Sequence, residues 1–530
     1  MQDESFPIAY RYHQATEHSV WSIQANQHTL DWRNEPLKEK RYLDTASVAL
    51  PVDLPVGDMP AIEAIVYRDD VEGIEIQPTF EQIAYLLYYS AGITKKLIYP
   101  QGAFNFRAAA CAGGLYPIEV YLVCGDLEGL AAGVYHFNPV SYQMDVLREG
   151  DYRAVLVEAG AEEPALARAP AVLIYTAITW RSSWKYQSRA YRYHFWDAGT
   201  MLANSLAGTV VQNLPVKVVM GFVDEQVNRL IGIDGHEEKS LCLLPIGMSA
   251  EPPPAVDELP VLTPEVLPLS ESRQEYPLID EVHIASSLET SAEVKAWRQA
   301  ADSVHTADLE GEFLDLQVEE LDRLPEKRFE TVVVERGSSR RFLHEPVPYP
   351  ALSTILARAT SPFPTDWIGP QGSFLNRIFL SVHDIEGLEP GAYAYHQQQG
   401  TLELIRSGHF RSQAAHICLG QNLGGDSAAT FFFMADLNAV LGRFGDRGYR
   451  LVQMEAGILG GRIYLGAYAY GYGATGLTFF DREMVAFFQP ESEGLEAVFT
   501  VAFGVPGSAS GHGWRKNRLV RLGPGENRGG

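Results

Sequence analysis

The second half of this 530-residue chain repeats the first. EGLAAGVYHF, which begins at Glu128, returns as EGLEPGAYAY at Glu386, a displacement of 258 residues. The same displacement carries residues 188–199 onto 446–457, with two arginines, a tyrosine and the closing Ala-Gly matched. A chain of this length also exceeds the size at which one hydrophobic core keeps growing. We therefore expect two copies of one domain.

A proline-rich, acidic stretch, EPPPAVDELPVLTPEVLPLSES, separates the copies at residues 251–272 and is typical of an extended linker. The shared strand-like endings LPIG at Gly247 and VAFG at Gly504 show that the repeat spans most of each half. These features predict an N-terminal extension, two domains, the linker between them and a basic C-terminal tail. The predicted bounds are 1–55, 56–250, 273–510 and 511–530 for the extension, the domains and the tail.

Each half shows the same order of predicted elements. A helix opens it (FEQIAYLLYYSAGI and YPALSTILARAT), short apolar strands follow, and a long helix precedes the final strand. Helices interleaved with a mostly antiparallel sheet indicate the α+β class. The long helices are rich in small residues, among them Gly199 and Gly457, so each is buried on all sides. Each is either a core helix of its own domain or packs on the other, and we favour the second because duplicated domains preserve a two-fold interface.

Composition excludes several classes of function. The formal net charge of -25 and the pI near 5.0 argue against nucleic-acid and anionic-membrane partners. The four cysteines form no C-x-x-C pair, so we expect no disulfide framework, no thiolate zinc site and no other metal site. The N-terminus lacks a signal-peptide pattern and no apolar run reaches membrane-spanning length. A cytoplasmic protein is expected.

Four segments together resemble the SagB/ThcOx-type branch of the FMN-dependent nitroreductase family, in the family's order: YHQATEHS, LDWRNEP, RAAACAGGLYPIEVYLV and WKYQSRAYR. The resemblance implies two-fold dimers with FMN between subunits, one subunit binding the phosphate and the other covering the ring. Here a fused duplicate would replace the dimer as an intrachain pseudo-dimer, with higher oligomers still possible. Related azoline dehydrogenases oxidise heterocyclised peptides, so the expected substrate is a small molecule or a modified peptide.

The family's phosphate-binding pattern R-x-S-x-R matches Arg336, Ser338 and Arg340. Two guanidiniums and a hydroxyl suit a phosphate dianion because charge-assisted hydrogen bonds are strong. The alternative is a solvated basic turn. In the first half Arg68 is followed by three carboxylates within four residues, which would repel a phosphate.

The loop ACAGGLYP resembles the family's PSAGALYP, which lets backbone approach the flavin. This assigns to FMN the residues Cys111, Ala112, Gly113, Gly114 and Leu115, with Cys111 replacing the usual serine. The aligned IGPQGSFL of the second half lacks the Leu-Tyr-Pro. The alternative is an ordinary glycine-rich turn.

Lys185 and Tyr186 match the Lys-Tyr pair that azoline dehydrogenases use as proton acceptor. A lysine desolvated beside a flavin loses pKa and can act as a base. The repeat places Arg443 and Phe444 at these positions in the second half, where neither can be a general base. The alternative is two exposed loop residues.

GYGATG at residues 471–476 formally matches G-x-G-x-x-G, but it follows the long helix and leads into LTFFD, which we expect to be a strand. A dinucleotide fingerprint needs the opposite context. In the resembled family this turn faces the flavin, which assigns Gly473, Ala474 and Gly476 to FMN; a plain helix stop is the alternative. Arg515 in the basic tail is a further candidate for the phosphate, or simply an exposed residue.

The two halves thus differ in complementary ways, and one working FMN site is predicted. The favoured function is an FMN-dependent oxidoreductase that transfers hydride between flavin N5 and an organic substrate. The alternatives are an NAD(P)H-driven nitro- or quinone-type reductase and a non-catalytic flavin-binding or partner-binding protein.

Overall fold

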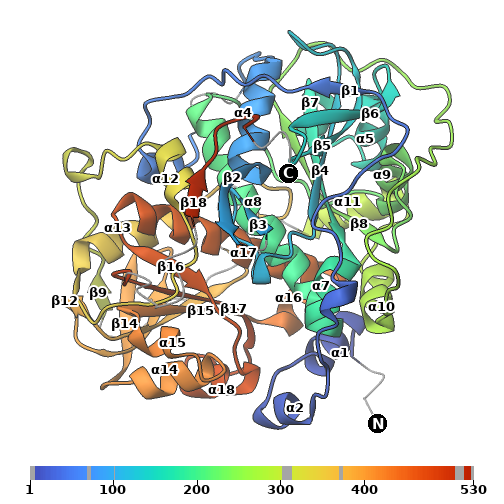
Figure 1. Ribbon diagram of the computed structural model, residues 1–530. Helices are drawn as coiled ribbons and strands as arrows, with labels where there is room; N and C mark the ends of the chain where they lie inside the picture. Colours follow the sequence, from blue (N-terminus) through green and yellow to red (C-terminus); the bar gives the residue numbers. More distant parts are fainter. Residues whose placement is uncertain are drawn as a thin grey trace.

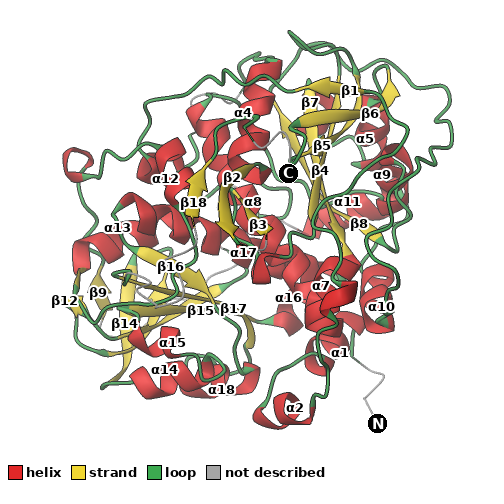
Figure 2. Cartoon of the chain, viewed as in Figure 1, coloured by secondary structure: helices red, strands yellow, loops and turns green. Residues whose placement is uncertain are grey.

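The computed structural model describes residues 6–68, 73–100, 102–300, 313–368, 374–507 and 518–526. Each half contains one large antiparallel sheet, and these two sheets lie on opposite sides of a central pair of long helices (Figure 1). The fold is α+β, as predicted, and Figure 2 shows helices flanking both sheets. No helix among the described residues is long and apolar enough to cross a membrane.

The two sheets have equivalent strand orders. The first runs β1-β6-β5-β4-β7-β8, and the second runs β9-β14-β13-β11-β15-β17-β16. The strands of the first are β1 (Ser47–Ala49), β4 (Ile118–Cys124), β5 (Gly133–Asn138), β6 (Gln143–Glu149), β7 (Ala171–Ile178) and β8 (Glu238–Ile246). Those of the second are β9 (Phe313–Asp315), β11 (Arg377–Val382), β13 (Gly391–His396), β14 (Thr401–Ser407), β15 (Ala429–Ala435), β16 (Gly473–Gly476) and β17 (Glu496–Gly504).

The helices repeat in the same way. The first half has α1 (Ile8–Ala15), α2 (Val20–Ala25), α3 (Ala61–Ala64), α4 (Phe80–Ala91), α5 (Arg153–Ala159), α6 (Pro164–Arg168), α7 (Thr179–Tyr186), α8 (Ala190–Val211) and α9 (Asp224–Ile231). The second has α10 (Pro277–Ala285), α11 (Ser291–Gln299), α12 (Phe329–Glu335), α13 (Tyr349–Ala359), α14 (Arg411–Ile417), α15 (Asn422–Asp426), α16 (Leu437–Phe444), α17 (Arg447–Ala469) and α18 (Asp481–Phe487).

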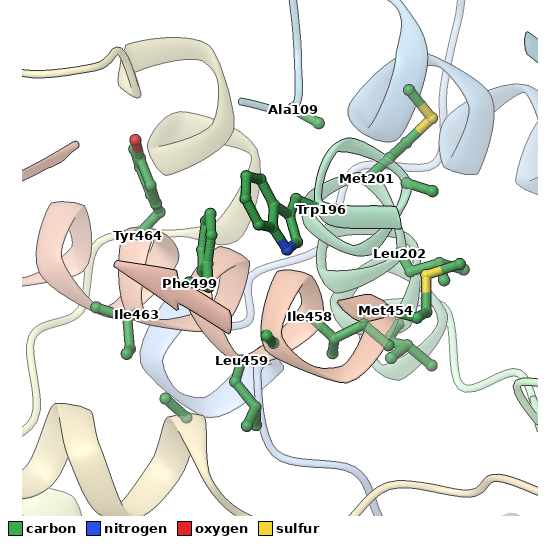
Figure 3. Packing of buried hydrophobic residues seen from close by; sticks show 14 of the residues in the cluster. Ala109, Trp196, Met201, Leu202, Met454, Ile458, Leu459, Ile463, Tyr464 and Phe499 are labelled. Atoms are coloured by element: carbon green, nitrogen blue, oxygen red, sulfur yellow. The ribbon is translucent and has the colours of Figure 1, made fainter. Parts of the chain in front are cut away.

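The long helices α8 and α17 pack directly on each other, which confirms the predicted pairing. A Cβ built on Gly199 would lie 2.6 Å from the Cα of Gly457, so the two backbones touch where both residues are glycine. Beside this contact the indole of Trp196 donates a hydrogen bond to Gln453 at 2.7 Å. Its rings lie 5.2 Å from the ring of Phe499 (Figure 3). Small residues therefore set the distance between the halves.

Reciprocal ion pairs also join the halves. Two arginines at the start of each long helix reach an aspartate at the start of a short helix of the other half. Burial acts to raise the pKa of Asp481, but its two arginine partners outweigh burial and lower the pKa to about 2. The pairs are Arg189 and Arg192 with Asp481, and Arg447 and Arg450 with Asp224. This arrangement is that of a two-fold dimer within one chain.

The internal repeat extends to helices α1 and α10. Arg192 donates to the carbonyl of His13 on α1 at 2.6 Å, and Arg450 donates to the carbonyl of His283 on α10 at 2.8 Å. Helix α1 lies within the predicted N-terminal extension, so part of that segment belongs to the repeated unit. The remaining domain bounds stay predictions.

Two extended segments and a small sheet complete the fold. The linker runs beside the N-terminal segment, with a hydrogen bond from the Leu37 amide to the Leu269 carbonyl at 2.8 Å. Strands β2 (Ile93–Tyr99) and β3 (Gly102–Arg107) form a hairpin in the first half. The C-terminal strand β18 (Arg518–Arg521) pairs with β2, so the end of the chain crosses back to the first half (Figure 1). In the second half, β10 (Val347–Pro348) pairs with β12 (Ile385–Glu386).

Candidate functional site

The predicted catalytic pair and the predicted flavin-covering loop lie together. Lys185 and Tyr186 are the last residues of α7, which follows β7 directly. A Cβ built on Gly113 would lie 2.7 Å from the Tyr186 hydroxyl and 3.1 Å from the Lys185 Nζ. Gly113 and Gly114 have φ of 64° and 65°, the left-handed region in which glycine is favoured. The loop approaches both side chains this closely because it carries glycine there.

Charges from the second half act on this pair. Lys185 is half-buried, and burial lowers its pKa, with further lowering by Arg340 of the second half and by Lys38. Burial raises the pKa of Tyr186 well above its ordinary value. The Tyr186 ring stacks on Tyr193 at 4.1 Å, nearly parallel at 6°. Arg340 is exposed, and its charge lowers the pKa of Lys185, so the R-x-S-x-R motif contributes charge to the surroundings of the pair.

Helix α8 holds the covering loop through two side chains one turn apart. The carboxylate of Asp197 accepts the Ala112 amide at 2.8 Å and the Cys111 thiol at 3.1 Å. Thr200 donates to the carbonyl of Ala110 at 2.6 Å. Asp197 is buried, and burial raises its pKa to about 7. Leu115, the last loop residue assigned to the cofactor, is buried at the end of this loop.

The sequence analysis missed Asp197, although the repeat contained a signal for it. Glu455 occupies the position 258 residues later and accepts the Asn376 amide at 2.8 Å. A carboxylate in a buried helix is costly unless it has a partner, and both copies carry one at this position. Such a pair of carboxylates therefore indicates that each long helix holds a neighbouring loop through hydrogen bonds.

The segment with the R-x-S-x-R motif docks against the start of the covering loop. Arg336 follows α12, and its buried guanidinium donates to the carbonyl of Ala108 at 2.9 Å and to that of Arg107 at 3.3 Å. Ser338 lies next to Tyr464, with 3.4 Å between the two hydroxyl oxygens. The predicted phosphate-binding residues thus reach the interface and contact the half that carries the covering loop.

Residues Gly473, Ala474 and Gly476 form the edge strand β16 beside this segment. The Ser339 amide donates to the Ala474 carbonyl at 3.0 Å, and the Gly476 amide donates to Tyr464 at 2.5 Å. A Cβ on Gly473 would lie 2.1 Å from the Ser339 hydroxyl oxygen, so a larger residue there would require the Ser339 side chain to move.

The expectation of a strand at LTFFD was wrong. The strand is Gly473–Gly476 itself, and the next four residues have no regular structure before α18 begins at Asp481. Their apolar side chains are buried, Phe479 completely. These residues are therefore hydrophobic because they pack in the core, although they form no strand.

The residues around Arg336 fit a phosphate group. Among the described residues, the hydrogen-bond partners of the Arg336 guanidinium are two backbone carbonyls, and no carboxylate neutralises it. The neighbouring Ser339 hydroxyl is buried without a hydrogen-bond partner. A buried cation and an unpaired donor are costly unless an anion joins them. Arg515, the last candidate, lies outside the described residues.

Protein fills the mirrored position in the second half. Helix α16 is the counterpart of α7 and ends at Phe444, whose ring lies 5.6 Å from the buried Trp297. Trp297 also packs tightly against Gly221, where a Cβ would lie 2.7 Å from the indole. The buried carboxylate of Asp366 accepts the amides of Met220 and Gly221, both at 2.8 Å. These described side chains pack closely at the mirrored position, while residues 369–373, which align with the covering loop, lie outside the described residues.

The counterpart of the phosphate-binding motif is also altered. Pro60 and Arg328 face each other across the two-fold as an isolated bridge, which places Arg68 opposite Arg336 in the repeat. Arg68 is exposed and pairs with Glu63 at 3.3 Å. The acidic residues that follow it lie outside the described residues.

Comparison with known proteins matches the family model described as "Nitroreductase family" twice, at residues 78–248 and 333–505. The fold resembles the crystal structure of a protein assigned as a nitroreductase from Anabaena variabilis ATCC 29413. That likeness has a TM-score of 0.74 and 25% identity over 94% of this chain and 100% of the other.

Two sequence relatives match parts of the chain. MJ1384 of Methanocaldococcus jannaschii, assigned as a nitroreductase, is 24% identical over 209 residues, 39% of this chain and 99% of its own length. The trifolitoxin-processing protein TfxB of Rhizobium leguminosarum bv. trifolii is 28% identical over 165 residues, 30% of this chain. The match spans 44% of TfxB, less than half of that protein.

Proposed function

Since the chain belongs to the nitroreductase family, we propose that it is an FMN-dependent oxidoreductase with a single site between its two halves. One observation carries the proposal most: Lys185 and Tyr186 meet Gly113 of the covering loop in the first half. The charge of Arg340, from the second half, acts to lower the pKa of both side chains. The mirrored position is filled by buried side chains. A flavin bound here would accept or donate hydride at N5.

Both halves would contribute to binding. Arg336, Ser338 and Arg340 would hold the phosphate, because the first is a buried cation without a carboxylate partner among the described residues. The loop from Cys111 to Leu115 would cover the ring. Strand β16 would line the ring edge through Gly473, Ala474 and Gly476, whose small or absent side chains allow close approach of the backbone.

Lys185 would accept the proton that accompanies hydride transfer. Its lowered pKa increases the fraction of neutral amine that can act as a base. Tyr186 stays a neutral phenol because its pKa is raised, so its hydroxyl can donate a hydrogen bond to substrate. Its stacking on Tyr193 fixes the ring and therefore the direction of the hydroxyl.

The likeness to TfxB, a trifolitoxin-processing protein, supports a modified peptide as substrate. The likeness to MJ1384 along its whole length supports the second candidate, reduction of a nitro or quinone compound with NAD(P)H. The two functions differ in which compound reduces the flavin. Mixing the oxidised protein with NADPH, and separately with a thiazoline-containing peptide, distinguishes them by which one bleaches the flavin.

The first test separates binding from chemistry. Lys185→Ala and Tyr186→Phe should leave FMN bound and slow flavin reduction or reoxidation by substrate, because removing a positioned acid–base group costs roughly 10²- to 10⁴-fold. In the unsubstituted protein the rate should rise with pH and level off below the ordinary lysine pKa of about 10.4, since the neutral amine is the active form. Stopped-flow absorbance measures both.

The matched control is Lys295→Ala, which removes an exposed lysine that pairs with Glu162 far from this site. It should leave the rate unchanged. Full rates in both the Lys185 and Tyr186 variants would remove these residues from the reaction.

A further inference from the structure

A second buried cation lies beside Arg336 and comes from the other half. Lys95 is on β2 of the first half and is 7% exposed. Its ammonium donates a hydrogen bond to the backbone carbonyl of Arg336, the first residue of the R-x-S-x-R motif. This hydrogen bond joins the hairpin of one half to the predicted phosphate-binding segment of the other.

The charged groups around Lys95 do not neutralise it. Arg336 and Glu335 face it from the end of α12, and Arg521 faces it from the C-terminal strand. Glu335 is already shared between Lys327 at 3.2 Å and Arg521 at 3.4 Å. Among the described residues, no carboxylate lies within ion-pair distance of Lys95. Burial, and then the neighbouring Arg336, lower the pKa of Lys95 to about 7.

The C-terminal strand pairs with the strand that carries Lys95. Arg521 on β18 is the cross-strand partner of Lys95, and the Leu522 amide donates to the Thr94 carbonyl at 2.8 Å. Two buried cations side by side are unfavourable unless an anion compensates them. A phosphate dianion supplies that charge and accepts several hydrogen bonds.

The repeat shows the same asymmetry as the motif. Helices α4 and α13 end at equivalent residues, Ala91 and Ala359. Phe363 of the second half is therefore the repeat counterpart of Lys95. Phe363 is buried and packs against the guanidinium of Arg462 at 4.7 Å. At this pair of equivalent positions, the lysine lies in the segment that contacts R-x-S-x-R and the other half carries a phenylalanine.

We propose that Lys95 binds the FMN phosphate from the first half, so that both halves hold this group. The inference rests on the proposed function, because it requires FMN at the interface. It changes the division of roles between the halves: the half that covers the ring also supplies one charge to the phosphate.

The test is titration of apo-protein with FMN and with riboflavin, which lacks the phosphate. Lys95→Met keeps the length of the side chain and should weaken FMN binding by about ten- to a hundredfold, the range expected for one charge-assisted contact. Riboflavin binding should be unchanged. Thermal unfolding of the apo-variant should occur at the same or a higher temperature, because the substitution removes charge repulsion. Lys96→Met, at the next and less buried position, is the matched control and should bind FMN normally.

A pH series tests the same point without a variant. Bound phosphate should raise the pKa of Lys95 above its value of about 7 in the unbound protein. FMN affinity should therefore fall as pH rises from about 7 towards the pKa of the bound state, because binding then requires the uptake of a proton. The Lys95→Met protein should lose this fall. Equal weakening of FMN and riboflavin in the variant, or no weakening, would overturn the role of Lys95. Failure of the unsubstituted protein to bind FMN would instead overturn the proposed function.

Discussion

Arg336 and Arg340 belong to one motif but lie in different environments. Arg336 is buried and hydrogen-bonded to backbone carbonyls of the other half, whereas Arg340 is exposed and lowers the pKa of Lys185. A buried charge is poorly screened by salt, and an exposed one is strongly screened. The two arginines should therefore contribute to phosphate binding in ways that salt can separate.

Arg336→Ala should weaken FMN binding by roughly 1.5 to 3 kcal/mol, about ten- to more than a hundredfold in dissociation constant. The loss should change little between low and high salt, while the loss in Arg340→Ala should shrink at high salt. Arg68→Ala, at the mirrored position, is the control and should bind FMN like the unsubstituted protein. An equal loss of affinity in the Arg68 and Arg336 variants would mean that the halves are assigned the wrong roles.

Sequence reasoning at this scale found residues that carry a local pattern and missed those that act only through tertiary contacts. Lys185, Tyr186 and Gly113 stand in recognisable motifs, and the structure brings them together. Asp197 lies in the repeated block 188–199 but is not one of its identical residues, and Lys95 lies in a hairpin without a motif. Their significance depends on which backbone groups of the other segments they meet, and pattern alone does not supply that.

At the scale of elements, the pairing of α8 with α17 depends on glycine at the point of closest approach. Repeat and composition together predicted these helices and most strands of both sheets, because their apolar runs are long and regular. The exception, LTFFD, was apolar enough to be taken for a strand but is core-packing coil. Short apolar runs do not distinguish the two.

Gly199→Ala should destabilise the protein by about 1 to 3 kcal/mol, the typical cost of overpacking a close contact. The added methyl would lie 2.6 Å from the backbone of Gly457, which cannot move without shifting α17. Gly442→Ala in α16 is the matched control, because a Cβ there meets nothing within 4 Å. It should be neutral or stabilise by up to about 1 kcal/mol through helix propensity. Urea unfolding of the two variants measures the difference; equal midpoints would contradict a tight helix contact.

At the scale of the whole molecule, the two halves of the chain are arranged like the subunits of a two-fold dimer. The two symmetry-related positions at their interface have diverged. The reciprocal pairs of Asp224 and Asp481 with arginines of the opposite half keep the symmetric frame. Within that frame, one position retains the covering loop, Lys185, Tyr186 and the phosphate-binding motif. At the other, the buried side chains of Trp297 and Asp366 pack against Gly221. Fusion of the halves permits this divergence, because one site can be lost without losing the fold.

The flavin content of the purified chain tests this account most directly. Denaturation releases the cofactor, and flavin absorbance compared with protein concentration gives the ratio after saturation with FMN. The account predicts one FMN per chain, since among the described residues only one position combines the Lys-Tyr pair and the glycine-rich loop with buried cations that no carboxylate neutralises. A ratio near two would contradict it, because the position filled by Trp297 and Asp366 would then also bind flavin.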